Sequence, residues 1–354
     1  MLKRRIMCVL LAGVLMVSGC STADIGDAGN GPETTAEATV PETSETTAEI
    51  TETTKAPEPL EFNPHVHTDL LSEYVTEDMW TSLYNCIDAV RAGEDTFECS
   101  DEEAFKWCTD DTILGSFLPP ACTLVGGDGY EDGTGRLKYK MDKDKYLERE
   151  KVFEDEVVRM LNEAVRSDYS DFEKLMGIYA YVCRNFQYDY SSIDGNTVDE
   201  FSTYACLMTK QGICCEIAGA LSYLLLQCGV EATEFGGEGS AGYHDWTYVV
   251  IGGEGYHVDA TWAVYGGDPY GVLNLKYFMQ TEAERVSDGF EEKLEVDHVW
   301  PWKMDYDLGR FKATDEKFKS LHDWVTFQGM DTERNVIFCT DTDGNHFEFS
   351  YGDI

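Results

Sequence analysis

The chain has 354 residues and a formal net charge of −40, from 67 acidic and 27 basic residues. This length can bury a sizeable core and suffices for one large domain or two ordinary ones. The acidic balance argues against nucleic acid as a partner, because binding to phosphates needs clustered Lys and Arg. It suits a soluble surface in a salty exterior and carries no information on the fold.

The first 20 residues have the pattern of an export signal. A basic start, "MLKRR", precedes the apolar run "IMCVLLAGVLMVSG", which is short for a membrane span and typical of a signal-peptide core. "VSGC" resembles the bacterial lipobox, in which small residues precede a cysteine that is lipidated and becomes the mature N-terminus. We therefore expect export, with Cys20 lipid-anchored to the outer face of the bacterial cell membrane. A signal peptide cut elsewhere and a short anchor helix are the alternatives.

Residues 21–62 have the composition of a disordered acidic stalk. They are rich in Thr, Glu, Ala and Pro, and Lys55 is their only basic residue. Such a segment cannot bury enough apolar surface to fold. His65 and His67 follow in "HVH" without further metal ligands beside them, so we interpret them as the end of the linker.

From residue 63 the composition becomes globular, and residues 63–149 are predicted to form a mostly helical N-terminal extension. Apolar residues have helical spacing after a capping Thr or Ser in "TEDMWTSLYNCIDAVRAG" (76–93) and "SDEEAFKWCTDDTIL" (100–114). The run "GRLKYKMD" (135–142) is a predicted strand. Two more amphipathic helices are expected at 148–166 and 168–189, the second beginning at Ser170 or Asp171.

Residues 214–228 are almost all apolar, which predicts a central, buried helix that Gly229 is well placed to end. Strand-like runs follow at 230–237, 244–253 and 255–262. A C-terminal pair at 335–340 and 345–351 flanks the turn "DTDG", whose glycine stands at the wrong offset for a calcium loop. Helices followed by antiparallel strands indicate an α+β fold, with residues 301–354 as a C-terminal β-hairpin extension.

The 12 cysteines do not have the spacing of a metal or redox motif. No pair is arranged as C-x-x-C, which argues against a zinc knuckle or a thioredoxin-type site. Cys86, Cys99, Cys108 and Cys122 fall close together, and they either pair as disulfides or fill the core as small hydrophobic residues. We expect no metal and no cofactor.

Cys214 has the context of a reactive thiol. It opens the buried helix, so its sulfur can lie at the positive end of the helix dipole, which favours the thiolate. Cys215 is rotated by about 100° around the helix and points elsewhere. A cysteine nucleophile also needs a base and a group that orients the base.

The hairpin "HDWTYVVIGGEGYHVDATW" offers both a candidate base, His244, and a candidate group to orient it, Asp259. A two-residue turn centred on Gly252-Gly253 predicts a definite strand register. The pairs that follow are Ile251 with Glu254, Val249 with Tyr256, and Trp246 with Asp259. One face then carries His244, Trp246, Tyr248, His257, Asp259 and Thr261, and the other carries Thr247, Val249, Ile251, Tyr256, Val258 and Ala260. His244 and Asp259 become diagonal neighbours on the first face, about 7–8 Å apart by backbone and within reach of a hydrogen bond. We expect the second face to pack and the first to carry the chemistry.

Three motifs in this order resemble the transglutaminase-like superfamily. Its bacterial members read G-V-C-x-G-Y-A, H-A-W and V-D-x-T-W, and this chain has "GICCEIA", "HDW" and "VDATW". Cys214 lies 30 residues before His244, and His244 lies 15 before Asp259, as in the family. The family's cysteine stands four residues before the alanine, here Ala218, which selects Cys214 over Cys215. "VCRNFQYDY" upstream and "LKYFMQTEAE" and "DHVW" downstream are also similar, so the resemblance covers about residues 150–300.

The resemblance implies a papain-like or transglutaminase-like core, in which a nucleophile helix packs on an antiparallel sheet, and a catalytic triad of Cys214, His244 and Asp259. It also implies acyl transfer on peptide or protein amides, in which an acyl-thioester forms and is then resolved. Resolution by water gives a protease or amidase, and resolution by a lysine amine gives a cross-linking transglutaminase. The sequence leaves both open, and it does not indicate the oligomeric state.

The chain departs from the family beside two of the triad residues. Glu216 and Ile217 replace the usual Gly and Tyr, and Asp245 replaces a small residue. The candidates for lining the substrate cleft are Glu216, Trp246 and Trp262. The backbone N–H of Cys214 is the expected oxyanion donor, with Gln187, Tyr188 and Tyr204 as candidates for the second.

A domain that keeps this fold only for binding, as a cell-surface interaction module, is the alternative function. Loss of a triad residue would favour it, and none is lost. Other cysteine hydrolase families fit less well.

Overall fold

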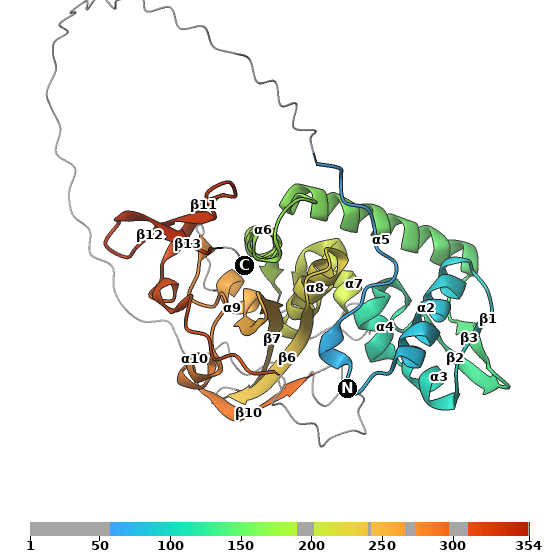
Figure 1. Ribbon diagram of the computed structural model, residues 1–354. Helices are drawn as coiled ribbons and strands as arrows, with labels where there is room; N and C mark the ends of the chain where they lie inside the picture. The colour runs from blue at the N-terminus through green and yellow to red at the C-terminus, as the bar shows by residue number, and fades with distance from the viewer. Residues whose placement is uncertain (1–56, 190–201, 240–241, 266–272, 297–310, 353) are drawn as a thin grey trace, which may run out of the picture.

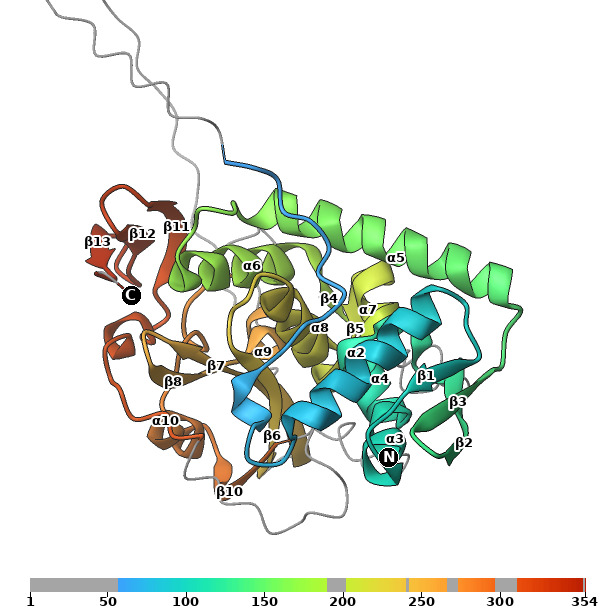
Figure 2. The same ribbon diagram turned by 45° about the vertical axis from the view of Figure 1, so that its right-hand side comes forward.

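The computed structural model describes residues 57–189, 202–239, 242–265, 273–296, 311–352 and 354 (Figure 1). The predicted signal sequence with Cys20, most of the predicted stalk and the "DHVW" segment lie outside these residues. The described residues form a mixed α+β protein with antiparallel sheets. The N-terminal extension and the C-terminal sheet lie on opposite sides of the core (Figures 1 and 2).

The N-terminal extension contains a small sheet as well as helices. Its elements are α2 (Glu77–Arg91), β1 (Thr96–Glu98), α3 (Glu102–Cys108), α4 (Asp111–Phe117), β2 (Val125–Glu131) and β3 (Thr134–Tyr139). The strands pair antiparallel in the order β1-β3-β2, so the description as mostly helical is incomplete. The predicted helix over 100–114 is two helices, because the Asp110 side chain accepts the Thr112 N–H and caps a new helix there.

The last residues of the predicted stalk are ordered against the core. The Leu60 N–H donates to Asn162 Oδ1 at 2.8 Å, and the Phe62 ring packs edge-on against Phe153 with centroids 6.5 Å apart. Both partners belong to the long helix α5 (Lys143–Ala164), over which this segment runs (Figure 2). The globular part therefore begins before residue 63, because two apolar side chains in an otherwise polar segment suffice to dock it.

His65 and His67 also belong to the folded part. Their rings pack against Tyr84 and Trp80 of α2, with centroids 4.7 and 4.4 Å apart. The interpretation of these histidines as linker was wrong. Among the described residues, no group of three or more His, Cys, Asp or Glu side chains is placed to hold a metal ion.

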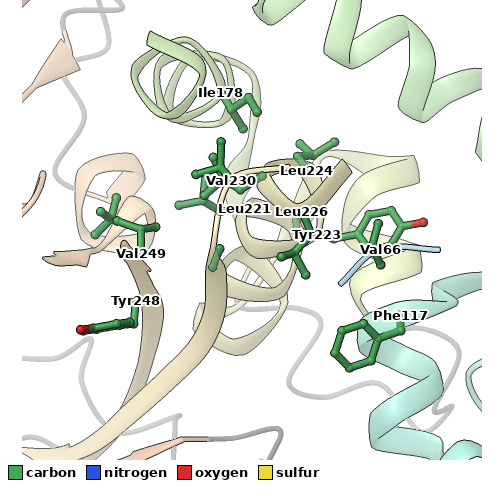
Figure 3. Close-up of a cluster of buried hydrophobic side chains, with 14 of the residues drawn as sticks. Val66, Phe117, Ile178, Leu221, Tyr223, Leu224, Leu226, Val230, Tyr248 and Val249 are labelled. Atoms are coloured by element: carbon green, nitrogen blue, oxygen red, sulfur yellow. The ribbon is translucent and has the colours of Figure 1, made fainter. Parts of the chain in front are cut away.

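The centre of the protein is helix α8 (Cys214–Gln227), packed between other helices and a sheet. Helix α6 (Asp171–Asn185) begins after Ser170, one of the two predicted starts. Ser170 and Glu173 form a capping box there. Figure 3 shows Ile178 of α6, Phe117 of α4 and Val249 of the sheet gathered around Leu221 and the other leucines of α8. Cys228 and Gly229 end the helix, and Gly229 has the positive φ of 75° that suits a glycine.

The sheet beside α8 has four antiparallel strands in the order β10-β6-β7-β8. They are β6 (Ala232–Gly239), β7 (Gly242–Ile251), β8 (Glu254–Val258) and β10 (Phe290–Val296). The short elements around it are β4 (Gln187–Tyr188), α7 (Thr203–Thr209), β5 (Gln211–Gly212), α9 (Ala260–Tyr265), β9 (Leu273–Asn274) and α10 (Glu282–Ser287).

The C-terminal hairpin is part of a larger sheet. Strands β12 (Val336–Thr340) and β13 (His346–Ser350) form the predicted pair, but β11 (Thr326–Asp331) and β9 extend it to four strands in the order β13-β12-β11-β9. Tyr351 stacks on Phe172 of α6 at 4.4 Å and donates to Glu173, which fixes this sheet to the core. The separate extension expected from residue 301 was therefore an incomplete description.

None of the ten cysteines among the described residues forms a disulfide. Of the four candidates for pairing, Cys86, Cys99, Cys108 and Cys122 are all buried, which supports the interpretation as small core residues. The helices of the described part are all too short or too polar to cross a membrane.

Candidate active site

The start of α8 is held by its own first turn. The Ile213 N–H donates to the Glu216 carboxylate at 2.9 Å, so Glu216 caps the helix. Its negative charge also interacts favourably with the positive end of the helix dipole. Glu216 is buried, and this contact gives it a structural role instead of the predicted position in a cleft wall. The helix consequently begins at Cys214, whose side chain is only 1% exposed, while Cys215 is half-buried.

The Cys214 thiol meets a carboxylate of strand β7. Its sulfur donates to Asp245 Oδ2 across 3.7 Å. Two residues along the same strand, the Thr247 hydroxyl donates to the carbonyl of Ala218 at 3.1 Å, so α8 covers the face of the sheet that carries Asp245 and Thr247. The nucleophile helix therefore packs on the face expected only to pack, and the close approach of Cys214 to His244 stays a prediction.

The register of the hairpin is confirmed for two of the three predicted pairs. Gly252 and Gly253 have φ values of 62° and 86°, as a two-residue turn of this type requires. The pairs of β7 with β8 include Ile251 with Glu254 and Val249 with Tyr256. Asp259 lies one residue beyond β8, because its Oδ1 accepts the Trp262 N–H at 3.0 Å and so begins helix α9. The expectation of a strand through Trp262 was wrong at this point.

The second oxygen of Asp259, Oδ2, contacts both His244 and Arg285. His244 Nε2 lies 2.8 Å from Asp259 Oδ2, and Arg285 Nη2 donates to the same oxygen at 2.9 Å. All three side chains are buried, Arg285 completely. His244 and Asp259 are thus brought together as expected, and Arg285 is an addition that the motifs did not indicate.

Burial alone would raise the pKa of Asp259, but its neighbours outweigh that effect. The charges of His244 and Arg285, the His244 hydrogen bond and the Trp262 N–H together hold the pKa of the carboxyl below its ordinary value. The carboxylate therefore stays ionised at neutral pH. An ionised, fully bonded carboxylate is the group that fixes the orientation of an imidazole base.

Arg285 reaches this site because residues 277–280 run beside β8. The Asp259 N–H donates to the Tyr277 carbonyl at 2.9 Å, and His257 and Gln280 exchange two backbone hydrogen bonds. Helix α10 follows immediately and carries Arg285, whose Nη1 also donates to Gln280 Oε1 at 3.2 Å.

Aromatic rings enclose the buried guanidinium and the imidazole. The Arg285 guanidinium carbon lies over the rings of Trp246, Trp262 and Phe290, at 4.2, 4.9 and 4.5 Å from their centroids. Trp262 is half-buried and stacks on His244 at 5.1 Å, as a wall of an accessible site can. Trp246 is 1% exposed and its Nε1 donates to His257 Nδ1, so it belongs to the core and does not line an open cleft.

His257 is a second buried histidine of the same hairpin. Burial and, next, the charge of Arg285 lower its pKa to about 3, so it is neutral at physiological pH. Its Nδ1 accepts from Trp246 and therefore carries no proton. His257 thus has a structural role.

Comparison with known proteins adds the family. The model of the transglutaminase-like superfamily matches residues 159–262, the segment that contains Cys214, His244 and Asp259. This chain carries a transglutaminase-like superfamily domain. No protein of curated function matches the chain.

Two solved structures are similar over part of the chain. One, described as a provisionally assigned cysteine protease from Cytophaga hutchinsonii, is 16% identical with a TM-score of 0.25, over 39% of this chain and 61% of that one. The other, described as a TGase, is 12% identical with a TM-score of 0.29, over 43% of this chain and 48% of that one. The chain therefore spans less than two thirds of the length of either structure.

The candidate oxyanion donors of the transglutaminase-like domain fall in two places. Strands β4 and β5 pair parallel, Gln187 with Gln211 and Tyr188 with Gly212, which puts residues 187 and 188 beside the segment that leads into Cys214. Tyr204 lies against α5 instead. Its ring stacks on Phe153 at 5.6 Å and under the Arg149 guanidinium at 3.5 Å, which disfavours it as a donor.

Two residues of the site lay beyond sequence reasoning. Arg285 stands 26 residues after Asp259 and directly follows the family-like segment "LKYFMQTEAE", which was the available signal. Asp245 was visible as a departure from the family pattern, and that departure was the available signal, but its contact with Cys214 was not foreseen.

Proposed function

We propose that this protein is a cysteine acyltransferase or hydrolase that acts on peptide or protein amides through Cys214, His244 and Asp259. The observation that carries the proposal is the buried His244–Asp259 pair at 2.8 Å, within a transglutaminase-like domain that retains a cysteine at the start of its central helix. A base oriented by a carboxylate and a thiol at a helix N-terminus are the two parts that thiol acyl transfer needs.

The roles of the two imidazole nitrogens follow from the hydrogen bond. His244 Nε2 is engaged by Asp259, which leaves Nδ1 to take the proton of Cys214. The thiolate then adds to the amide carbonyl carbon, and the tetrahedral oxyanion is stabilised by backbone N–H groups such as that of Cys214. His244 returns the proton to the departing amine, and a thioester on Cys214 results.

The thioester is resolved by a second nucleophile. His244 takes a proton from water or from a primary amine, and the attack releases Cys214 as a thiol. Water yields a free acid, which is proteolysis or deamidation, and a lysine amine yields a cross-link. Which of them reacts decides between a peptidase and a transglutaminase.

One experiment separates these outcomes. The purified protein is incubated with a peptide library and a labelled primary amine, and the products are identified by mass spectrometry beside a Cys214→Ala control. We expect hydrolysed or amine-labelled peptides and an acyl adduct on Cys214 in the wild-type protein only. Unchanged peptides and an unmodified Cys214 would contradict an enzyme and leave a binding module.

The site of action is a separate part of the proposal. The basic, apolar and "VSGC" segments at the N-terminus support lipid attachment at Cys20 and a position on the outer face of the membrane. The Cys20→Ala variant should stay unlipidated and leave the membrane fraction. Membrane retention of both forms, with no lipid detected on wild-type Cys20, would contradict the anchor.

A further inference from the structure

Asp245 is the departure from the family pattern that lies closest to the candidate nucleophile. The residue after the histidine is usually small, whereas here it is an aspartate that is only 3% exposed. Its Oδ2 accepts the Cys214 thiol hydrogen at 3.7 Å. A buried carboxylate in contact with a thiol has a consequence for that thiol, because two negative charges at this separation repel each other.

The strand opposite Asp245 leaves room for this carboxylate. Gly236 of β6 pairs directly with Asp245. A Cβ at Gly236 would lie 2.7 Å from Asp245 Oδ1 and 2.5 Å from the Tyr243 hydroxyl, closer than carbon and oxygen approach. A side chain at position 236 would therefore crowd both the Tyr243 ring and the Asp245 carboxylate, and the glycine leaves room for both on this face.

We propose that Asp245 is a positioning residue that restrains Cys214 in the resting protein. It holds the thiol hydrogen, and its negative charge opposes formation of the thiolate that the helix N-terminus favours. Before it reacts with His244, the Cys214 side chain turns away from Asp245. The inference rests on the proposed function, because it assigns regulation to the same nucleophile.

The other titratable groups on this side of the sheet are few. Tyr243 lies on the same face of β7, Glu234 and Glu238 lie on the same face of β6, and Glu216 lies in the first turn of α8. Glu216 is bound to the Ile213 N–H. The Asp245 carboxylate contacts the sulfur directly, so its replacement is expected to have the largest effect on the thiol.

The test is the rate at which iodoacetamide alkylates Cys214, followed by peptide mapping between pH 5 and 9. In the Asp245→Asn variant, which keeps the size of the side chain, we expect labelling at pH 7 to be at least about fivefold faster, and the pH profile of labelling to move to lower pH. Cys215 in the same sample is the control, and its rate should change less than twofold.

A second variant crowds the carboxylate and keeps its charge. The methyl group of Gly236→Ala would meet the Tyr243 hydroxyl and Asp245 Oδ1, and we expect it also to speed labelling, by less than Asp245→Asn. Slower or unchanged labelling of Cys214 in a folded Asp245→Asn protein would overturn the inference, as would equal acceleration of Cys215. If Asp245→Asn fails to fold, as judged by circular dichroism, Gly236→Ala decides in the same way.

Failure of the proposed function has a different signature. If His244→Ala leaves Cys214 labelling unchanged, in the wild-type and in the Asp245→Asn background, His244 is not the base for this thiol. The effect of Asp245→Asn on Cys214 labelling would then still test the role of Asp245 independently of His244.

Discussion

The β7–β8 hairpin holds two buried histidines that differ in what they contact. His244 is bonded to the ionised carboxylate of Asp259, and its other nitrogen is available for a second partner. His257 accepts a hydrogen bond from Trp246 and lies near the positive charge of Arg285, which helps to lower its pKa to about 3. The same residue type on the same face is thus paired with an ionised carboxylate at one position and kept neutral at the other.

The difference shows what Arg285 does in this protein. One guanidinium helps to keep Asp259 ionised and at the same time disfavours a positive charge on His257. Burial is common to both histidines, so burial alone does not make a base. In the proposed mechanism the carboxylate partner does, because it would stabilise an imidazolium on His244.

The largest expected effect separates the two histidines by activity. His244→Gln should lower kcat/KM by about 10²–10⁴-fold, because it removes the general base. His257→Gln, with an oxygen that can accept from Trp246, should stay within about threefold of wild type. The measurement is steady-state kinetics on a peptide found by the library experiment. Equal losses in two folded variants would show that the histidines do not differ in function.

Removing the positive charge of Arg285, which lies beside Asp259 and near His257, should lower the stability of the protein. Arg285→Met leaves the Asp259 carboxylate buried beside a neutral side chain, and we expect a loss of about 3–5 kcal/mol in the free energy of unfolding by urea denaturation. Arg285→Lys keeps the charge and should recover part of the lost free energy of unfolding. A Met variant as stable as wild type would show that the buried ion pair is dispensable.

The pH dependence of stability sharpens the contrast at His257. Its pKa is about 3 in the folded protein against 6.5 ordinarily, so the unfolded chain binds a proton that the folded chain excludes between these values. The contribution of His257 to the free energy of unfolding is fully present above pH 6.5. It is lost as the pH falls from 6.5 toward 3, by about 1.4 kcal/mol per pH unit. His257→Gln should flatten that part of the curve by about this slope. An unchanged slope would mean that His257 is not the neutral, buried group described here.

The smallest effect concerns the ring that stacks on His244. Trp262→Ala should lower kcat/KM by about 2–12-fold, which corresponds to the 0.5–1.5 kcal/mol typical of an aromatic pair. Trp262→Phe keeps a stacking ring and should lose less. A Phe variant as impaired as the Ala variant would point to a role for the indole other than stacking.

Local patterns predicted the parts of the site that local interactions determine. The Gly252-Gly253 turn and the alternation of side chains gave the strand register, and the capping residue and apolar run gave the start of α6 and the position of Cys214. The close pairing of His244 and Asp259 follows from that register, although Asp259 turned out to start a helix.

The remainder depends on contacts between distant segments. Arg285 is positioned by residues 277–280 running beside β8. These residues belong to the family-like segment "LKYFMQTEAE", but the segment does not indicate which strand it lies beside. The same holds for β9, which joins strands more than 50 residues later in the chain. The face of the sheet that meets Cys214 was likewise missed. The helix packs on the face that was expected only to pack, because both faces of β7 carry residues that can be buried.

The central claim is that Cys214 is the nucleophile and His244 its base. Iodoacetamide labelling near neutral pH, resolved by peptide mapping, tests it directly because Cys215 is an adjacent and more exposed thiol in the same molecule. We predict that Cys214 is labelled faster than Cys215 although Asp245 slows its reaction, and that the difference is well over tenfold in the Asp245→Asn variant. His244→Ala should slow labelling of Cys214 strongly, Asp259→Asn should slow it less, and Cys215→Ala should leave it nearly intact. Faster labelling of Cys215, or a rate at Cys214 equal to that of the buried cysteines, would contradict the account.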